Sequence, residues 1–160
     1  MSQKTLSLLL KIMIIGVALC LAAVYIWVVP EIGGPLAEAG EGEFRSYYVP
    51  WLVIIELTAL PIIAALVLAW IIADNIGRDR SFCMQNAKLL GVISLLAAAD
   101  AGYFFIANVV MLLLNMNHPG LMLFSVLACF AGVVICVAAA GLSHFTRKAA
   151  KLQTDSDLTI

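Results

Sequence analysis

Two carboxylates, Glu56 and Asp100, lie inside long apolar stretches of the sequence. A carboxylate at the centre of a membrane-spanning helix costs roughly 2.5–3.5 kcal/mol on insertion scales, so such a residue usually has a function or a specific partner. The functional interpretation is a proton- or cation-coupled site. The alternative is a protonated carboxyl group that forms a hydrogen bond with a neighbouring helix, for which Asn108 and Tyr103 are candidate partners of Glu56.

The two carboxylates belong at different depths in a membrane. Asp100 follows Lys88 by twelve residues, which places it near the middle of its apolar stretch, whereas Glu56 follows Trp51 by only five. At a rise of about 1.5 Å per helical residue, Glu56 belongs in the outer third of the membrane. We therefore expect that these two groups do not form a carboxylate pair.

The remaining chemistry-bearing side chains form no pattern typical of a metal site, a redox pair or an enzyme. Cys129 and Cys136 are separated by about 10 Å along one predicted helix, which is beyond disulfide reach. His118 and His144 fall at opposite ends of the same apolar stretch, so they cannot bind one metal ion together. We predict no metal, no cofactor and no enzymatic activity, because no nucleophile–base arrangement is evident.

The composition is that of a membrane protein. Apolar residue types make up 64% of the 160 residues and charged types 12%, against about 45–50% and about 25% in soluble domains. The formal net charge of −1 gives no attraction to nucleic acid, so we expect membrane lipid, and no nucleic acid, as the direct environment. These values exclude a disordered chain, a basic nucleic-acid-coating protein and an ordinary soluble enzyme.

Four apolar stretches are long enough to cross a hydrocarbon core of about 30 Å as helices. The predicted fold class is therefore all-α, an integral membrane bundle of four transmembrane helices in a single domain. The predicted helices cover residues 6–29, 51–73, 88–114 and 121–145. They are joined by an outer loop at 30–50, a cytoplasmic loop at 74–87 and a short outer turn, and a cytoplasmic tail follows at 146–160.

The basic residues predict the orientation. Only Arg45 falls on one side of this topology, whereas eight basic residues fall on the other: Lys4, Lys11, Arg78, Arg80, Lys88, Arg147, Lys148 and Lys151. Cytoplasmic loops carry the excess of Lys and Arg, so both termini are predicted to be cytoplasmic (N-in/C-in). We expect a multi-pass protein of the bacterial inner membrane.

Small residues and one proline predict how the helices pack. Pro61 cannot donate to the Leu57 carbonyl, so a kink or a local opening is expected in the second helix. Stripes of small residues allow close packing in lipid. The predicted packing positions are Gly102 in the third helix and Ala128, Gly132, Cys136 and Ala140 in the fourth. Because Gly102 and Asp100 face nearly opposite directions, we predict a homo-oligomer.

The cytoplasmic segments offer positions for a partner. Ser81 is a reasonable N-cap for the third helix, with Phe82 in the membrane interface. The basic groups serve topology and contact with anionic lipid in one interpretation. In the other they form a docking surface, for which the candidates are Arg78, Arg80, Ser81, Phe82, Asn86, Lys88, Arg147, Asp157, Leu158 and Ile160.

The sequence resembles a bacterial membrane family known as domain of unknown function 2975 (DUF2975). The resemblance is carried by Ser81-Phe82 followed by Gln85-Asn86-Ala87-Lys88-Leu89-Leu90, and by the ending Asp157-Leu158-Thr159-Ile160. Cys83 departs from the pattern, because a polar residue is expected there. The resemblance brings no activity with it. It does imply a small cytosolic helix-turn-helix regulator of the Cro/repressor type as a partner.

Three functions remain open from the sequence. The first is a regulatory or sensory membrane protein that binds a cytosolic helix-turn-helix regulator. The second is a small transporter or channel subunit that uses Asp100 and Glu56. The third is a structural or assembly component of the membrane.

Overall fold

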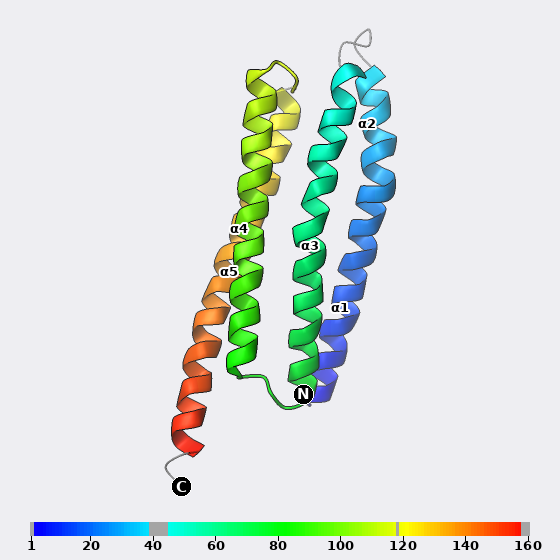
Figure 1. Cartoon of the computed structure of the whole chain (residues 1–160). Coiled ribbons are helices and arrows are strands. Elements are labelled where there is room, and N and C mark those ends of the chain that lie inside the picture. The colour runs from blue at the N-terminus through cyan, green and yellow to red at the C-terminus, as the bar shows by residue number, and fades with distance from the viewer. Residues whose placement is uncertain (1, 39–44, 118, 158–160) are drawn as a thin grey trace.

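The protein is all-helical over the residues that the computed structural model describes, which are 2–38, 45–117 and 119–157 (Figure 1). The long helices are α1 (Gln3–Ala23), α2 (Val29–Glu38), α3 (Tyr48–Gly77), α4 (Met84–Leu113) and α5 (Pro119–Asp157), with a π-helix at Val24–Val28 and a 3-10 turn at Arg45–Tyr47. Four segments are long and apolar enough to cross a membrane: Gln3–Pro35, Arg45–Gly77, Met84–Leu113 and Gly120–Thr154. The predicted all-α fold with four spans is confirmed.

The helices pack in the order of the chain and form an open bundle. α1 packs on α3, α3 on α4, and α4 on α5, whereas over the described ranges no Cα atom of α1 comes within 8 Å of one in α4 or α5, and none of α3 comes within 8 Å of one in α5. Figure 1 shows the resulting two pairs side by side. Large apolar side chains are mostly exposed, and the buried apolar residues are mostly small: Ala73, Ala87, Ala101, Met111, Cys129, Ala139 and Ala150. Such a bundle relies on lipid, or on other protein, to cover its apolar faces.

The tightest packing joins α4 and α5 along a seam of small residues. On α5 the seam consists of Ser125, Cys129, Gly132, Cys136, Ala139, Ser143, Thr146 and Ala150, all buried or half-buried. These positions are spaced alternately by four and three residues, which is the 3.5-residue repeat of helices that coil around each other. Two serines fasten the seam across the helices: Ser143 Oγ donates to the Ala87 carbonyl at 2.6 Å, and Ser94 Oγ donates to the Cys136 carbonyl at 2.9 Å.

The predicted packing positions divide between the seam and the outside. Gly132 and Cys136 lie in the seam, and a Cβ atom added at Gly132 would stand 3.0 Å from the Ala101 Cβ. Ala128 and Ala140 are exposed instead, because the 3.5-residue repeat turns them away from α4. Gly102 is also exposed, with open space around its Cα.

Pro30 and Pro61 both lie within helical segments of the structure. The first helix was predicted to end at residue 29, yet the chain continues through the π-helix into α2, so part of the predicted outer loop is helical. Pro30 lacks an N–H and its ring would clash with the carbonyl four residues earlier, and the wider π-helix just before it accommodates this conflict. Pro61 lies inside α3, which remains helical on both sides of it.

Candidate functional site at the basic end

One end of the helices brings together the beginning of the chain, the α3–α4 connection and the last turns of α5 (Figure 1). We call it the basic end, because the eight basic residues predicted to be cytoplasmic lie in these segments or in the helical turns next to them. Ser81 Oγ donates to the Gln3 side-chain carbonyl at 3.1 Å, which ties the connection to α1. The connection itself is only six residues long, 78–83, because α3 and α4 both extend into the predicted 74–87 loop.

Two asparagines hold this connection in one conformation. Asn75 Nδ2 donates to Asn86 Oδ1 at 2.8 Å, and Asn86 Nδ2 donates to the carbonyls of Arg80 and Ser81, each at 3.0 Å. Asn86 is 1% exposed. Asp79 takes a left-handed conformation with φ of 59°, which turns the chain so that the Arg80 N–H donates to the Asn75 carbonyl at 2.9 Å. Asn86, predicted as a docking residue, is therefore inaccessible and fixes the turn.

The N-cap of α4 is Cys83, not Ser81 as the sequence suggested. The Cys83 side chain accepts from the backbone N–H of Asn86 at 3.4 Å, and α4 begins at Met84. Oxygen-bearing side chains are the usual N-caps. The thiol thus occupies the position where the resemblance led us to expect a polar residue.

Ion pairs and one serine hold α1 against the end of α3. Lys11 Nζ lies 2.9 Å from one Asp74 carboxylate oxygen, and Arg78 lies 2.8 Å from the other. Lys11 also lies 5.2 Å from the ring centroid of Trp70. Ser7 Oγ donates to the Ala73 carbonyl at 2.6 Å. Arg78 is therefore engaged within the chain, although its exposed side chain makes this a weak link.

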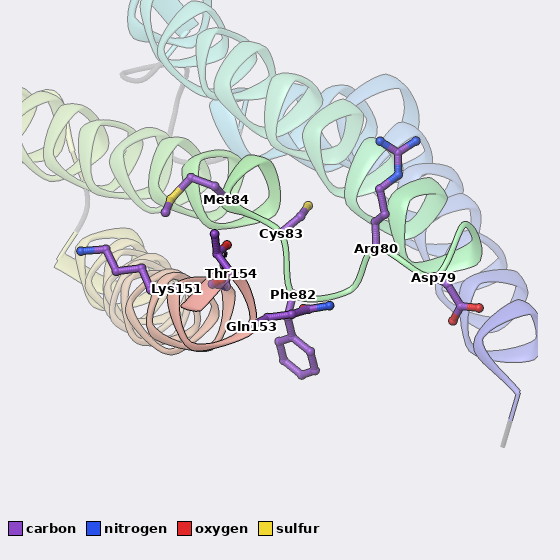
Figure 2. A pocket seen from close by; sticks show the side chains of 9 residues that line it. Asp79, Arg80, Phe82, Cys83, Met84, Lys151, Gln153 and Thr154 are labelled. Atoms are coloured by element: carbon purple, nitrogen blue, oxygen red, sulfur yellow. Dashed lines mark hydrogen bonds between the residues drawn. The ribbon is translucent and has the colours of Figure 1, made fainter. Parts of the chain in front are cut away.

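A hollow of about 480 Å³ separates the 78–83 connection from the last turns of α5. Its lining includes Arg80 and Phe82 from the connection and Lys151 and Gln153 from α5. In the view of Figure 2, Arg80 and Phe82 extend from opposite sides of the connection. Phe82 is 59% exposed, and Leu152 of α5, which does not belong to the lining, is 62% exposed. The basic end thus has a hollow and, beside it, exposed apolar and basic side chains.

Of the predicted docking residues, only Arg80 and Phe82 belong to the described lining of this hollow. Lys88 of α4 and Arg147 of α5 are exposed. Asp157 is the last residue of α5. Leu158 and Ile160 lie outside the described residues. The sequence did not single out Leu152 or Lys151 as docking residues, although their place beyond the fourth apolar stretch was a signal for exposure.

The polar residues within the spans are not gathered in one place. Asn108 Nδ2 donates to the Phe104 carbonyl at 2.8 Å, and its Oδ1 accepts from Asn117 at 3.1 Å. Asn108, one of the two candidate partners of Glu56, forms these hydrogen bonds within α4 and with the segment after it, whereas Glu56 is exposed in a groove between α1 and α3.

Asp100 and Tyr25 are two further polar residues within the spans. Asp100 Oδ1 is buried without a hydrogen-bond partner among the described residues. The Tyr25 hydroxyl, which the sequence analysis did not single out, lies 2.6 Å from Thr58 Oγ1. In the described part of the chain, no group of three or more His, Cys, Asp or Glu side chains could hold a metal ion.

Comparison with known proteins agrees with the membrane assignment. The chain is 27% identical over 163 residues to the "Uncharacterized membrane protein YoaS" of Bacillus subtilis (strain 168), a match that covers 96% of this chain and 97% of that protein. No solved structure matches the chain. Residues 36–160 match the family described as "Protein of unknown function (DUF2975)". The resemblance seen in the motifs around Asn86 and in the ending is thereby confirmed, and this multi-pass membrane protein belongs to the DUF2975 family.

Proposed function

We propose that the protein is a regulatory or sensory component of the bacterial inner membrane that binds a small cytosolic helix-turn-helix regulator at its basic end. In this proposal both termini are cytoplasmic, as the distribution of Lys and Arg indicates. The proposed docking surface comprises Arg80, Phe82, Lys151 and Gln153, which line the hollow, and extends around the last turns of α5 to the exposed Leu152 on the other face of that helix. The family resemblance supports the nature of the proposed partner, and the geometry of the basic end supports the surface proposed to receive it.

The length of α5 supports a surface that stands in water. α5 has 39 residues, so at 1.5 Å per residue it is about 58 Å long, nearly twice a hydrocarbon core of about 30 Å. Ser143 lies beside Ala87, close to the start of α4, so the last turns of α5 extend past the other helices (Figure 1). In this proposal the exposed Leu152 on that extension lies in water, beyond the hydrocarbon core.

One observation carries the proposal: Phe82 and Leu152 are exposed at the end of the molecule that carries the basic residues. Exposed apolar side chains surrounded by charge are typical of a protein-binding surface. Arg80 and Lys151 line the hollow together with one acidic residue, Asp79, so the charged lining is net positive, which suits a partner with acidic residues around an apolar contact. Asn75 and Asn86 hold the connection rigid, so little conformational freedom is lost when a partner binds.

The test compares capture of a cytosolic partner by three forms of the full-length protein in detergent. These are the wild type, the double variant Phe82→Ser/Leu152→Ser, and Val49→Ser. Val49 is 62% exposed at the opposite end of the molecule, so its change is the matched control. We expect the wild type and the control to retain a helix-turn-helix protein, identified by mass spectrometry and then bound again in purified form. The double variant is expected to bind roughly tenfold more weakly, as loss of about 1.4 kcal/mol requires.

Equal binding by the double variant would contradict the docking surface. A version that ends after Gln153 separates the surface from the tail. If binding survives this truncation but not the double variant, the residues of the surface suffice. If only the truncation abolishes binding, the docking site belongs to the terminal residues.

A second candidate function rests on Asp100. Its buried oxygen has no hydrogen-bond partner in the described chain, and a carboxyl group in that situation suits a proton- or cation-coupled transporter. The test is proton or cation flux into liposomes that contain the purified protein. Flux that Asp100→Asn abolishes would favour transport, and absence of flux in the wild type would remove this candidate.

A further inference from the structure

A groove of about 540 Å³ runs along the contact between α1 and α3, away from the basic-end hollow. Ile14 and Trp70 lie at one end of it, and Ile26 and Glu56 lie at the other. Because Glu56 and Trp70 are fourteen residues apart on one helix, the groove is about 21 Å long. This is a length that suits a single alkyl chain.

One charged side chain interrupts the otherwise largely apolar lining of this groove. Glu56 is exposed there, and no basic side chain lies within ion-pair distance of it among the described residues. The neighbouring Tyr25 hydroxyl donates to Thr58 Oγ1, because the hydroxyl hydrogen of Thr58 is directed to the Ile55 carbonyl at 2.6 Å. A carboxyl group left facing lipid is unfavourable, and a cation placed against it would relieve that cost.

We propose that this groove binds a single-chain amphiphile with a cationic head group. The head lies against Glu56 in the outer third of the membrane, and the alkyl chain follows the groove towards Trp70. Charge complementarity selects this occupant. A neutral lipid chain would leave the carboxyl group unpaired, and an apolar helix from a second copy would bury it without a partner.

The position of Trp70 provides the measurement. The chain has three tryptophans, so the variant Trp27→Phe/Trp51→Phe leaves Trp70 as the single fluorophore. The probe is a hexadecyltrimethylammonium ion with a bromine atom at the far end of its chain, added to the purified protein in dodecyl maltoside micelles. Bromine quenches tryptophan only at close range, so quenching reports a chain that lies in the groove. The matched probe is the equally brominated hexadecyl sulfate.

We expect the cationic probe to quench Trp70 at concentrations roughly tenfold lower than the anionic probe does, a difference of about 1.4 kcal/mol. Glu56→Gln is expected to remove this preference and to leave the chain-dependent quenching in place. Asp100→Asn, a carboxyl group outside the groove lining, should retain the preference. Ala18→Phe should fill the groove and reduce quenching by both probes. Circular dichroism and gel filtration verify that each variant is folded.

Three outcomes would overturn the proposal. Equal quenching by the two probes would identify an ordinary lipid-facing groove. Absence of quenching by either probe would mean that the groove is occupied, for instance by a second copy of the chain. A preference for the cationic probe that survives Glu56→Gln would locate the selectivity elsewhere.

Discussion

The side-chain amide of Asn75 donates to the side-chain carbonyl of Asn86 at 2.8 Å, across the connection that joins α3 to α4. The two residues are 8% and 1% exposed, so this bond is shielded from water. The Asn86 amide in turn donates to the carbonyls of two successive residues of the connection, Arg80 and Ser81. One buried side chain therefore determines how the connection turns and where Phe82 stands.

Replacement of Asn86 by alanine tests this role. Three hydrogen bonds are lost, and the Arg80 and Ser81 carbonyls are left without the amide that they bind. We expect the free energy of unfolding to fall by roughly 2–3 kcal/mol, because unsatisfied buried polar groups are costly. The measurement is unfolding by sodium dodecyl sulfate in mixed micelles, followed by circular dichroism.

The neighbouring Gln85 provides the matched control for that experiment. It lies in the same first turn of α4 but is exposed. Gln85→Ala should change the free energy of unfolding by less than about 0.5 kcal/mol, as surface substitutions usually do. If Asn86→Ala were as mild as Gln85→Ala, the asparagine pair would not be what holds the connection.

Gly132 tests the α4–α5 seam. A Cβ atom at this position would stand 3.0 Å from the Ala101 Cβ and 3.9 Å from the Ala97 carbonyl oxygen, so a larger side chain forces the two helices apart. We expect Gly132→Val to destabilise the protein by roughly 1–3 kcal/mol, the usual effect of overpacking. The same detergent unfolding measures it.

Gly141→Val is the control for the seam. It places the same side chain in the same helix, where nothing lies within 4 Å of the added Cβ. The difference between the two variants therefore isolates the contact with α4 from the helix propensity of valine. Equal destabilisation by both would show that the close approach at Gly132 contributes little.

The spacing of small residues in α5 shows what sequence patterns could reveal here. A repeat of four led to Ala128 and Ala140, whereas the seam contains Cys129 and Ala139. Two long helices in continuous contact coil around each other, so their contacts return every 3.5 residues, and a repeat of four drifts off the interface within a few turns. The alternation of four and three was present in the sequence, because every seam position from Ser125 to Ala150 is small.

Hydrophobicity and local chemistry predict different parts of this molecule. The four spans followed from the lengths of apolar stretches, because a long continuous apolar stretch satisfies its backbone in lipid as a helix, whereas the strands of a closed barrel have alternating apolar and polar residues. The buried role of Asn86 could not be read in the same way, since an asparagine near a helix start is equally suited to an exposed position. Its partners, Asn75 and the Arg80 carbonyl, are brought to it only by the turn that it stabilises.

The predicted orientation is testable with reporter fusions. Alkaline phosphatase fused after Glu38, in the segment predicted to be outside, should be active, because this enzyme folds only outside the cytoplasm. The same reporter fused after Gln153 should be inactive, and a green fluorescent protein fused there should be bright. The physical basis is the eight-to-one distribution of basic residues between the two sides. An active phosphatase after Gln153 would reverse the topology and move the proposed docking surface outside the cell.

Self-association is the last prediction, and it follows from the open packing of the helices. Ala98 and Gly102 form an exposed pair of small residues on α4, and open space surrounds Gly102, so a second copy can approach α4 closely there. We expect light scattering in dodecyl maltoside to give the protein mass of an oligomer, which is a whole-number multiple of 17.2 kDa and exceeds the mass of one chain. Gly102→Leu should shift this mass towards the monomer, whereas Gly16→Leu, which also fills open space but on α1, should not. A monomeric wild type, or an equal shift in both variants, would contradict an interface at Gly102.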